Sequence, residues 1–276
     1  MREGLSAILM GRDEERFLPL SLPPLRRVAD EIVFVDTGST DRTLEIAGDF
    51  GCRILHSPWA RDFSTPKNLA IEAAGCAWIL NVDCDEVLAD DPEWRERILA
   101  RCRATDRPAW IVTIDNLLAD GGSVPSKAIR LFRNDPRIRF VNPVHEGVAE
   151  SLYRHWPRHP PAEIGVRLIH HGYGAGLNKE KIRRNVAILR DWIDREPDTV
   201  YGRYKLGMNL RFLGMASEGL YHLEQAVALA GGDADRTSLP FLEELLAACF
   251  QGLLEAGHGE RAAALRRTVE GWARGE

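Results

Sequence analysis

The sequence has few of the features that mark disulfide-rich, zinc-ribbon and membrane proteins. It contains only five cysteines in 276 residues, an odd number without a C-x-x-C pair, which disfavours a disulfide framework and a zinc ribbon. No apolar run reaches the roughly 18 residues of a membrane-spanning helix, and the first apolar stretch is too short for a signal peptide. We therefore expect a cytoplasmic protein whose membrane association, if any, is peripheral, at the inner face.

An excess of basic residues is also missing. Lysine and arginine number 36 against 41 aspartate and glutamate residues, and the formal net charge is -5. This balance argues against a nucleic-acid partner, although it leaves room for a local basic pocket that holds a phosphorylated small molecule. The composition, 45% hydrophobic and 28% charged, is typical of a globular chain of one large or two smaller domains.

The first hundred residues alternate short β-type runs with helical patterns. Such alternation is typical of βαβ crossovers and of a mainly parallel sheet covered on both faces by helices. The Pro23-Pro24 pair is expected to break or kink the first helix. The expected strands are residues 5–10, 31–36, 52–57 and 77–83.

From residue 109 to about 171 the pattern changes to strands separated by polar turns, which indicates an antiparallel extension of the sheet. One of these expected strands is "IRFVNPVHEGV" at 138–148. Beyond Asn178 the pattern is helical throughout. We therefore expect an α/β domain over residues 1–177, with a Rossmann-type mixed sheet and helices on both faces, and an all-α region over 178–276.

Part of the helical region fits the tetratricopeptide pattern. Residues 201–233 match it at Leu206 and Gly207, and 241–272 is a weaker copy, offset by the repeat length of about 34 residues plus a linker. An unspecialised helical cap is the alternative. The basic stretch at 178–184 is either a site for phosphate or acidic lipid headgroups or the solvated face of a helix.

Acidic residues gather where three of the expected parallel strands end. The first strand runs into "GRDEE" (11–15), the second into "DTGSTD" (36–41) and the fourth into "DCDE" (83–86). Ligands of open parallel sheets bind at the carboxyl ends of the strands. We therefore expect the three loops to line one pocket.

Two of these loops have the residues for specific chemistry. Asp36 either accepts hydrogen bonds from a base or ribose or satisfies only the donors of its own turn. The D-x-D spacing of Asp83 and Asp85 lets two carboxylates approach one divalent cation, which can also bridge a diphosphate. A solvated acidic turn is the alternative for this loop.

The ordered set of motifs resembles a known family. The chain is similar to the bacterial inverting glycosyltransferases of family 2, which have a GT-A fold and often a tetratricopeptide-like tail. The resemblance covers most of residues 5–175 and implies a nucleotide-sugar donor, usually a UDP-sugar, held with Mn²⁺ or Mg²⁺. It rests on "VDTGSTDRTLEIAGDFG", "PWARDFSTPKNLAIEAAGCAWILNVDCDE", "VHEGV" and "LIHHGY".

The resemblance also implies roles for single residues. It places Asp36 at the nucleobase, Asp83 on the ribose side and Asp85 at the metal. The sequence departs from the family where relatives commonly have "KNEE" and "DFSKARN", because it has "RDEE" and "DFSTPKN" instead. The residues implied to contact the nucleotide-sugar are Arg12, Glu14, Asp36, Lys67, Asn68 and Asp83.

Inverting transfer needs a base that deprotonates the acceptor, and one-step glycoside chemistry suggests a carboxylate. Glu146 is the first candidate and Asp115 the second. The alternative for Glu146 is an ion pair with an arginine such as Arg130 or Arg133.

Two adjacent histidines, His170 and His171, follow an expected strand, so only one of them can face the pocket. That histidine is expected to ligate the metal or to contact the leaving diphosphate. A packed, hydrogen-bonded histidine is the alternative.

These patterns predict a metal-dependent inverting glycosyltransferase. Its expected acceptor is a saccharide, a lipid-linked molecule or a peptide, and its tail is expected to offer a surface for a membrane or a protein. A sugar nucleotidyltransferase is an alternative, disfavoured because no Gly-rich phosphate loop follows the first strand. A non-catalytic, nucleotide-binding adaptor built on the helical repeats is another.

Overall fold

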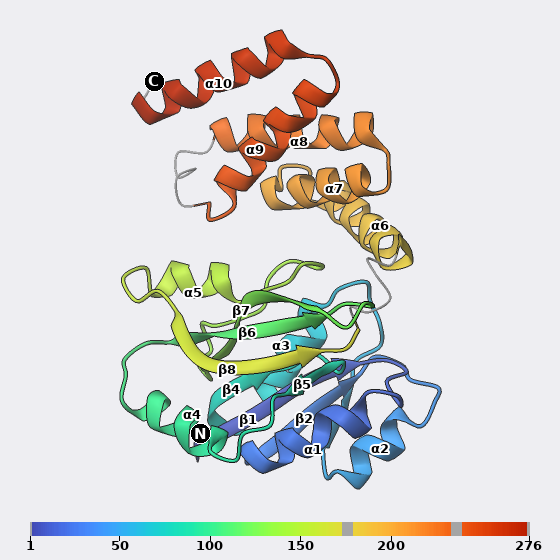
Figure 1. The fold of residues 1–276 in the computed structure, drawn as a ribbon, viewed down its shortest axis with the longest axis vertical. Helices are drawn as coiled ribbons and strands as arrows, with labels where there is room; N and C mark the ends of the chain where they lie inside the picture. Colours follow the sequence, from blue (N-terminus) through green and yellow to red (C-terminus); the bar gives the residue numbers. More distant parts are fainter. Residues whose placement is uncertain (1, 173–178, 233–238, 275–276) are drawn as a thin grey trace. The chain divides into compact units, whose positions relative to one another are not determined.

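The computed structural model describes residues 2–172, 179–232 and 239–274. The chain divides into two compact units, residues 1–176 and residues 177–276 (Figure 1). The predicted boundary between residues 177 and 178 lies outside the described residues. The division into a catalytic domain and a tail that we expect there stays a prediction.

The first unit is built on an eight-stranded mixed sheet with the order β3-β2-β1-β4-β7-β6-β8-β5. Strands β1 to β4 are parallel. Strand β7 runs antiparallel to β4 and β6, β8 is parallel to β6, and β5 is antiparallel to β8. The strands are β1 (Arg2–Gly11), β2 (Glu31–Asp36), β3 (Arg53–His56), β4 (Cys76–Asn81), β5 (Glu86–Leu88), β6 (Ala109–Leu117), β7 (Ser123–Arg133) and β8 (Ala162–His170).

Helices cover both faces of this sheet, and alternate strand residues point into two separate cores. Leu5, Ala7 and Leu9 of β1 pack in the core with α1, α2 and α4, whereas Ile8 packs in the core with α3 and α5. The predicted mixed sheet with helices on both faces is therefore confirmed (Figure 1). The helices are α1 (Leu18–Val28), α2 (Thr43–Asp49), α3 (Ser64–Ala73), α4 (Trp94–Arg103) and α5 (Ala149–His155).

Two local predictions differ from the structure: the break expected at Pro23-Pro24 is absent, and the strand expected at 138–148 is a loop. Helix α1 runs without a break from Leu18 to Val28 through Pro23 and Pro24, although each proline removes one backbone hydrogen bond of the helix. Residues 138–148 form a loop with one isolated bridge, between Val141 and Gly147. This segment carries β-type residues, but its backbone turns sharply at Asn142 and His145, where φ is positive.

Over residues 179–232 and 239–274 the second unit contains helices and turns without a strand, as predicted. Helices α7 and α8 approach closely at Gly207 and Gly219, where a β-carbon on Gly207 would lie 2.8 Å from the Gly219 carbonyl oxygen. None of the described helices is long and apolar enough to cross a membrane. The helices are α6 (Lys179–Arg195), α7 (Val200–Phe212), α8 (Ala216–Gly232), α9 (Leu242–Glu255) and α10 (Gly259–Arg274).

All five cysteines are free, and four of them are buried. Burial raises the pKa of the Cys52 thiol to about 11 and that of Cys102 to about 12. These thiols are therefore protonated and poorly reactive near neutral pH.

Candidate active site

The loops that follow β1, β2 and β4 lie together at the carboxyl edge of the parallel strands, as expected. Gly11 pairs with Asp36 in the sheet, and the backbone N–H of Asp13 donates to Ser39 Oγ at 3.0 Å. The amide of Thr40 donates in turn to Asp13 Oδ1 at 2.7 Å. The third loop joins them through Cys84 Sγ, which lies 3.4 Å from the Met10 carbonyl oxygen.

Asp36 is buried and accepts hydrogen bonds from the amides of Gly38 and Ser39 at 3.1 and 3.0 Å. Burial favours its neutral form, but hydrogen bonds from Ser39 and Gly38 outweigh burial and lower its pKa. The carboxylate thus satisfies its own turn, and its contact with a nucleobase stays a prediction. Arg12 and Glu14 stand in the loop beside it, with Arg12 largely exposed.

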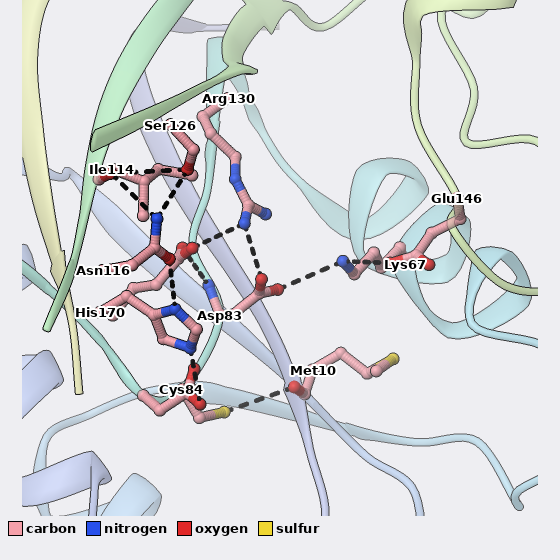
Figure 2. A network of polar contacts seen from close by, with 12 residues as sticks. Met10, Lys67, Asp83, Cys84, Ile114, Asn116, Ser126, Arg130, Glu146 and His170 are labelled. Atoms are coloured by element: carbon pink, nitrogen blue, oxygen red, sulfur yellow. Dashed lines mark hydrogen bonds and ion pairs between the residues drawn. The ribbon is translucent and has the colours of Figure 1, made fainter. Parts of the chain in front are cut away.

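A buried lysine joins two elements that are distant in sequence. Lys67 of α3 lies with its Nζ 2.6 Å from Glu146 Oε1 and 3.3 Å from Asp83 Oδ1. Figure 2 shows Lys67 between these two carboxylates. Burial lowers the pKa of Lys67, but Asp83 and Glu146 outweigh burial and raise it, so the ammonium stays charged. The alternative expected for Glu146 was an ion pair with an arginine. Glu146 does form an ion pair, but its partner is Lys67 and not Arg130 or Arg133.

Arg130 of β7 extends this network. Its Nη2 lies 2.7 Å from Asp83 Oδ2 and 2.7 Å from Glu86 Oε1 (Figure 2). Partial burial favours neutral Asp83, but Arg130 and Lys67 hold the pKa of this carboxyl well below its usual range. Burial raises the pKa of Glu86 to about 7 despite Arg130.

Asp85 and His170 form a second pair beside this network. His170 Nε2 lies 3.2 Å from Asp85 Oδ2, and its Nδ1 lies 2.9 Å from Asn116 Oδ1. The pKa of His170 is raised, chiefly by its contact with Asp85. His171 is exposed and donates only its backbone N–H to the Asp85 carbonyl, at 2.9 Å. Of the two histidines, His170 therefore faces the D-x-D loop.

Two further predicted residues bond to other partners. Asn68 donates its side-chain amide to the Phe140 carbonyl at 2.9 Å and accepts from the Phe140 amide at 2.9 Å. Asp115 pairs with Arg167, whose Nη2 lies 2.7 Å from Asp115 Oδ2. Because adjacent strand residues face opposite ways, Asp115 lies on the other face of β6 from Asn116. This arrangement favours Glu146 over Asp115 as the base.

Unfavourable backbone conformations are concentrated around the site. Among the described residues, the non-glycine positions with positive φ are Asp13, Arg61, Asn142 and His145, all in the loops beside Glu146, α3 and β1. Positive φ is unfavourable for most non-glycine residues, though less so for asparagine, aspartate and histidine, and strained residues cluster at functional sites. The turns at Asn142 and His145 place Glu146 opposite Lys67.

The residues at the D-x-D loop fit a divalent metal such as Mn²⁺. The carboxylate of Asp85 and the imidazole of His170 are suitable donors, and Gly172 leaves the carboxylate room, since a β-carbon there would lie 2.0 Å from Asp85 Oδ2. Within the described residues, no three His, Cys, Asp or Glu side chains gather as a complete cage. Substrate oxygens and water would have to complete the coordination.

Sequence reasoning did not assign roles to Glu86, Arg130 or Asn116. Glu86 is the third acid of "DCDE", so the crowding of like charges was a usable signal for it. Arg130 was considered only as a partner of Glu146. Nothing in the local sequence distinguishes Asn116 from any polar residue at a strand end.

Comparison with known protein families identifies the family of this chain. Residues 12–156, more than half of the chain, match the model of Glycosyl transferase family 2. The chain belongs to glycosyltransferase family 2. The predicted family and the predicted class of enzyme are confirmed.

Two curated relatives of this family 2 member show how far the likeness extends. A TPR repeat-containing protein of Synechococcus elongatus is 36% identical over 210 residues, which are 74% of this chain and 51% of the relative. The prophage-derived glycosyltransferase SunS of Bacillus subtilis is 26% identical over 207 residues, which are 72% of this chain and 47% of SunS. The chain thus spans about half the length of the curated relatives it matches.

Solved structures show the same fold as this family 2 member. S. aureus TarS 1–349 in complex with UDP-GlcNAc matches with a TM-score of 0.52 at 16% identity, over 100% of this chain and 93% of that chain. The match to S. aureus TarS has a TM-score of 0.51 and covers 54% of that chain. The predicted GT-A-like fold class is confirmed.

Proposed function

We propose that this family 2 member is a metal-dependent inverting glycosyltransferase that transfers a sugar from a nucleotide-sugar to an acceptor by single displacement. The observation that carries the proposal is the position of Glu146. Its carboxylate comes from a loop outside the sheet, yet lies 2.6 Å from a buried lysine that also contacts the first acid of the D-x-D loop.

Glu146 is the proposed base. The acceptor oxygen attacks the anomeric carbon, the bond from that carbon to the diphosphate oxygen breaks, and the acceptor proton passes to Glu146 Oε. Because attack and departure are on opposite faces of the sugar, the configuration inverts. The Lys67 ammonium, 2.6 Å from Glu146 Oε1, holds this carboxylate in position.

Lys67, Arg130 and Asp83 would form the wall next to the donor. The family resemblance implies that Lys67 contacts the nucleotide or its phosphates. Asp83 and Glu146 already bond to its ammonium, so a phosphate would compete with two carboxylates for the same three protons. We propose that Lys67 chiefly orients Glu146 and Asp83, while Asp36, Arg12 and Glu14 line the nucleoside.

Asp85 and His170 would hold Mn²⁺ or Mg²⁺, and His171 would not. When bound, such a cation neutralises the charge that develops on the leaving diphosphate. His170 would contribute a neutral ring nitrogen, which would suit Mn²⁺ better than Mg²⁺.

A UDP-sugar is the proposed donor, and TarS, a protein of the same fold, is described in complex with UDP-GlcNAc. The acceptor is a saccharide, a lipid-linked molecule or a peptide. The proposed acceptor surface includes the tip of the β6–β7 hairpin, which is exposed at residues 119–125.

The helical unit is proposed to act as a tetratricopeptide-like partner surface. One relative is named a TPR repeat-containing protein, and α7 with α8 forms the close helix pair that such a repeat needs. Lys179, Arg183 and Arg190 line a cavity of about 390 Å³ within this unit. These cations are the proposed contact for an acidic membrane or protein.

Thermal unfolding with nucleotides tests the donor site. UDP, GDP, CMP and dTDP would each be added with Mn²⁺ and with EDTA, and a ligand at about 100 times its Kd should add about 2.7 kcal/mol to the free energy of unfolding. We expect stabilisation by UDP that needs Mn²⁺ and is lost in Asp85→Ala. If the wild-type protein is folded and none of the nucleotides stabilises it, the proposal is refuted.

A further inference from the structure

Asn116, the next-to-last residue of β6, bridges three strands. Its side-chain Nδ2 donates to the Val124 carbonyl oxygen at 2.9 Å and to Ser126 Oγ at 3.0 Å, both on β7. Its Oδ1 lies 2.9 Å from His170 Nδ1 on β8. Figure 2 shows Asn116 between Ser126 and the His170 ring.

This network determines which way the amide of Asn116 points. A carbonyl oxygen can only accept, so the atom that faces Val124 must be the amide nitrogen. The amide oxygen therefore faces His170, and it can only accept as well. Consequently, Nδ1 of His170 must carry a proton, and Nε2 is the ring nitrogen that faces Asp85.

The sheet register supports the same arrangement. Asn116 pairs with Val124 on one side and with His170 on the other, and His170 pairs with Glu86 of β5. These four residues form one row across the sheet, from the β6–β7 hairpin to the D-x-D loop. A shift of the hairpin by one residue would replace Asn116 in this row.

We propose that Asn116 is a positioning residue that holds the His170 ring with Nδ1 protonated and Nε2 directed at Asp85. The proposal rests on the proposed function in one respect, because the oriented Nε2 is then the ring nitrogen available to a cation on Asp85. Residues that orient a metal-binding histidine in this way typically change metal affinity about 10- to 100-fold when they are replaced. Asn116 acts only through His170 and does not touch the substrate.

The test compares two replacements of Asn116. Asn116→Asp keeps an oxygen that accepts from Nδ1 but loses the donor to the Val124 carbonyl, whereas Asn116→Leu has a similar volume and neither group. Binding of Mn²⁺ in the presence of UDP would be measured by the electron paramagnetic resonance of free Mn²⁺. We expect Asn116→Leu to weaken binding about 10- to 100-fold and Asn116→Asp to stay within about threefold of wild type.

A double-mutant cycle separates positioning from general structural damage. In a His170→Ala background, Asn116→Leu should weaken Mn²⁺ binding no further, because the ring that Asn116 orients is gone. An equal loss in both backgrounds would overturn the proposal. Ser126→Ala, which leaves the Val124 contact in place, is the matched control and should bind Mn²⁺ like wild type.

A second readout does not depend on metal. In metal-free protein labelled with ¹⁵N-histidine, the Nδ1–H proton of His170 should be visible and slowly exchanging in wild type and Asn116→Asp, and lost in Asn116→Leu. An unchanged resonance in Asn116→Leu would overturn the proposal. If wild type binds no Mn²⁺ while the resonances behave as expected, the metal part of the proposed function fails and the role of Asn116 stands.

Discussion

At the scale of single residues, the candidate site depends on charges that compensate one another. Lys67 and Arg130 contact Glu146, Asp83 and Glu86, so two cations face three carboxyl groups, of which Glu86 has a pKa raised to about 7. Such a cluster is stable only while every member stays, because removing one partner leaves a buried charge uncompensated.

This balance predicts a non-additive pair of variants. Lys67→Met should lower the free energy of unfolding by about 3 kcal/mol, and adding Glu146→Gln should restore part of that loss, because Glu146 is then neutral. Glu146→Gln alone should lower kcat by about 10²- to 10⁴-fold with little effect on donor affinity. Urea unfolding and steady-state kinetics measure these effects. Additive destabilisation by the two changes would contradict the coupling.

A second residue-scale prediction concerns pH and α8. His222 is partly buried, and its Nδ1 has no hydrogen-bond partner among the described residues. Burial lowers its pKa, and Arg203 lowers it further. A lowered folded-state pKa means that the unfolded chain binds the proton more tightly, so the stabilisation present above the unfolded pKa is lost as pH falls.

We therefore expect the helical unit to lose stability below about pH 6.5, the ordinary pKa of histidine. His222→Gln, which does not titrate, should reduce that loss, as measured by circular dichroism melts between pH 7.5 and 5 of the two full-length proteins. An identical pH dependence in the variant would assign the effect to other groups.

At the scale of elements, the parallel strands could be predicted from the sequence, and the loop around Glu146 could not. Strands β1, β2 and β4 are buried on both faces and therefore appear as continuous apolar runs. Residues 138–148 contain β-type residues too, but the left-handed backbone at Asn142 and His145 depends on long-range contacts. One such contact is the hydrogen bond from Ser64 Oγ to the Asn142 carbonyl.

The candidate site also has a part that could be predicted from the sequence and a part that could not. The acids at the strand ends were predictable because strand direction alone brings them to one edge. The partners of those acids were not, because Lys67 and Glu146 are 79 residues apart, and Arg130 and Glu86 are 44 apart. Only the pairing of β4 with β7, and the path of the loop after β7, brings these charges together.

The loop conformation leads to a prediction of its own. Asparagine tolerates positive φ, and glycine does so without cost, whereas a β-branched residue does not. The free energy of unfolding of Asn142→Gly should therefore lie within about 0.5 kcal/mol of the wild-type value. Asn142→Val should lower the free energy of unfolding by more than about 1 kcal/mol and should lose most of the turnover. Equal stability of the two variants in urea would indicate that the turn is not held as described.

At the scale of the whole molecule, every candidate donor residue lies in the first unit. In the full chain, binding of UDP and Mn²⁺ should therefore slow the hydrogen exchange of backbone amides in the loops at 12–15, 37–42 and 83–86. Amides in α7 to α10 should exchange as in the free protein. Protection of the helical unit without protection of these loops would instead favour the adaptor hypothesis.

The buried cysteines give this two-unit molecule a practical advantage. Four of the five thiols are buried, and burial raises the pKa values of Cys52, Cys84, Cys102 and Cys249, so a maleimide near neutral pH should react with the native cysteines slowly. A cysteine introduced on an exposed position of each unit would then take a fluorophore ahead of the native ones. Energy transfer between two such labels would measure whether the distance between the units changes during turnover, in a protein that keeps all its own cysteines.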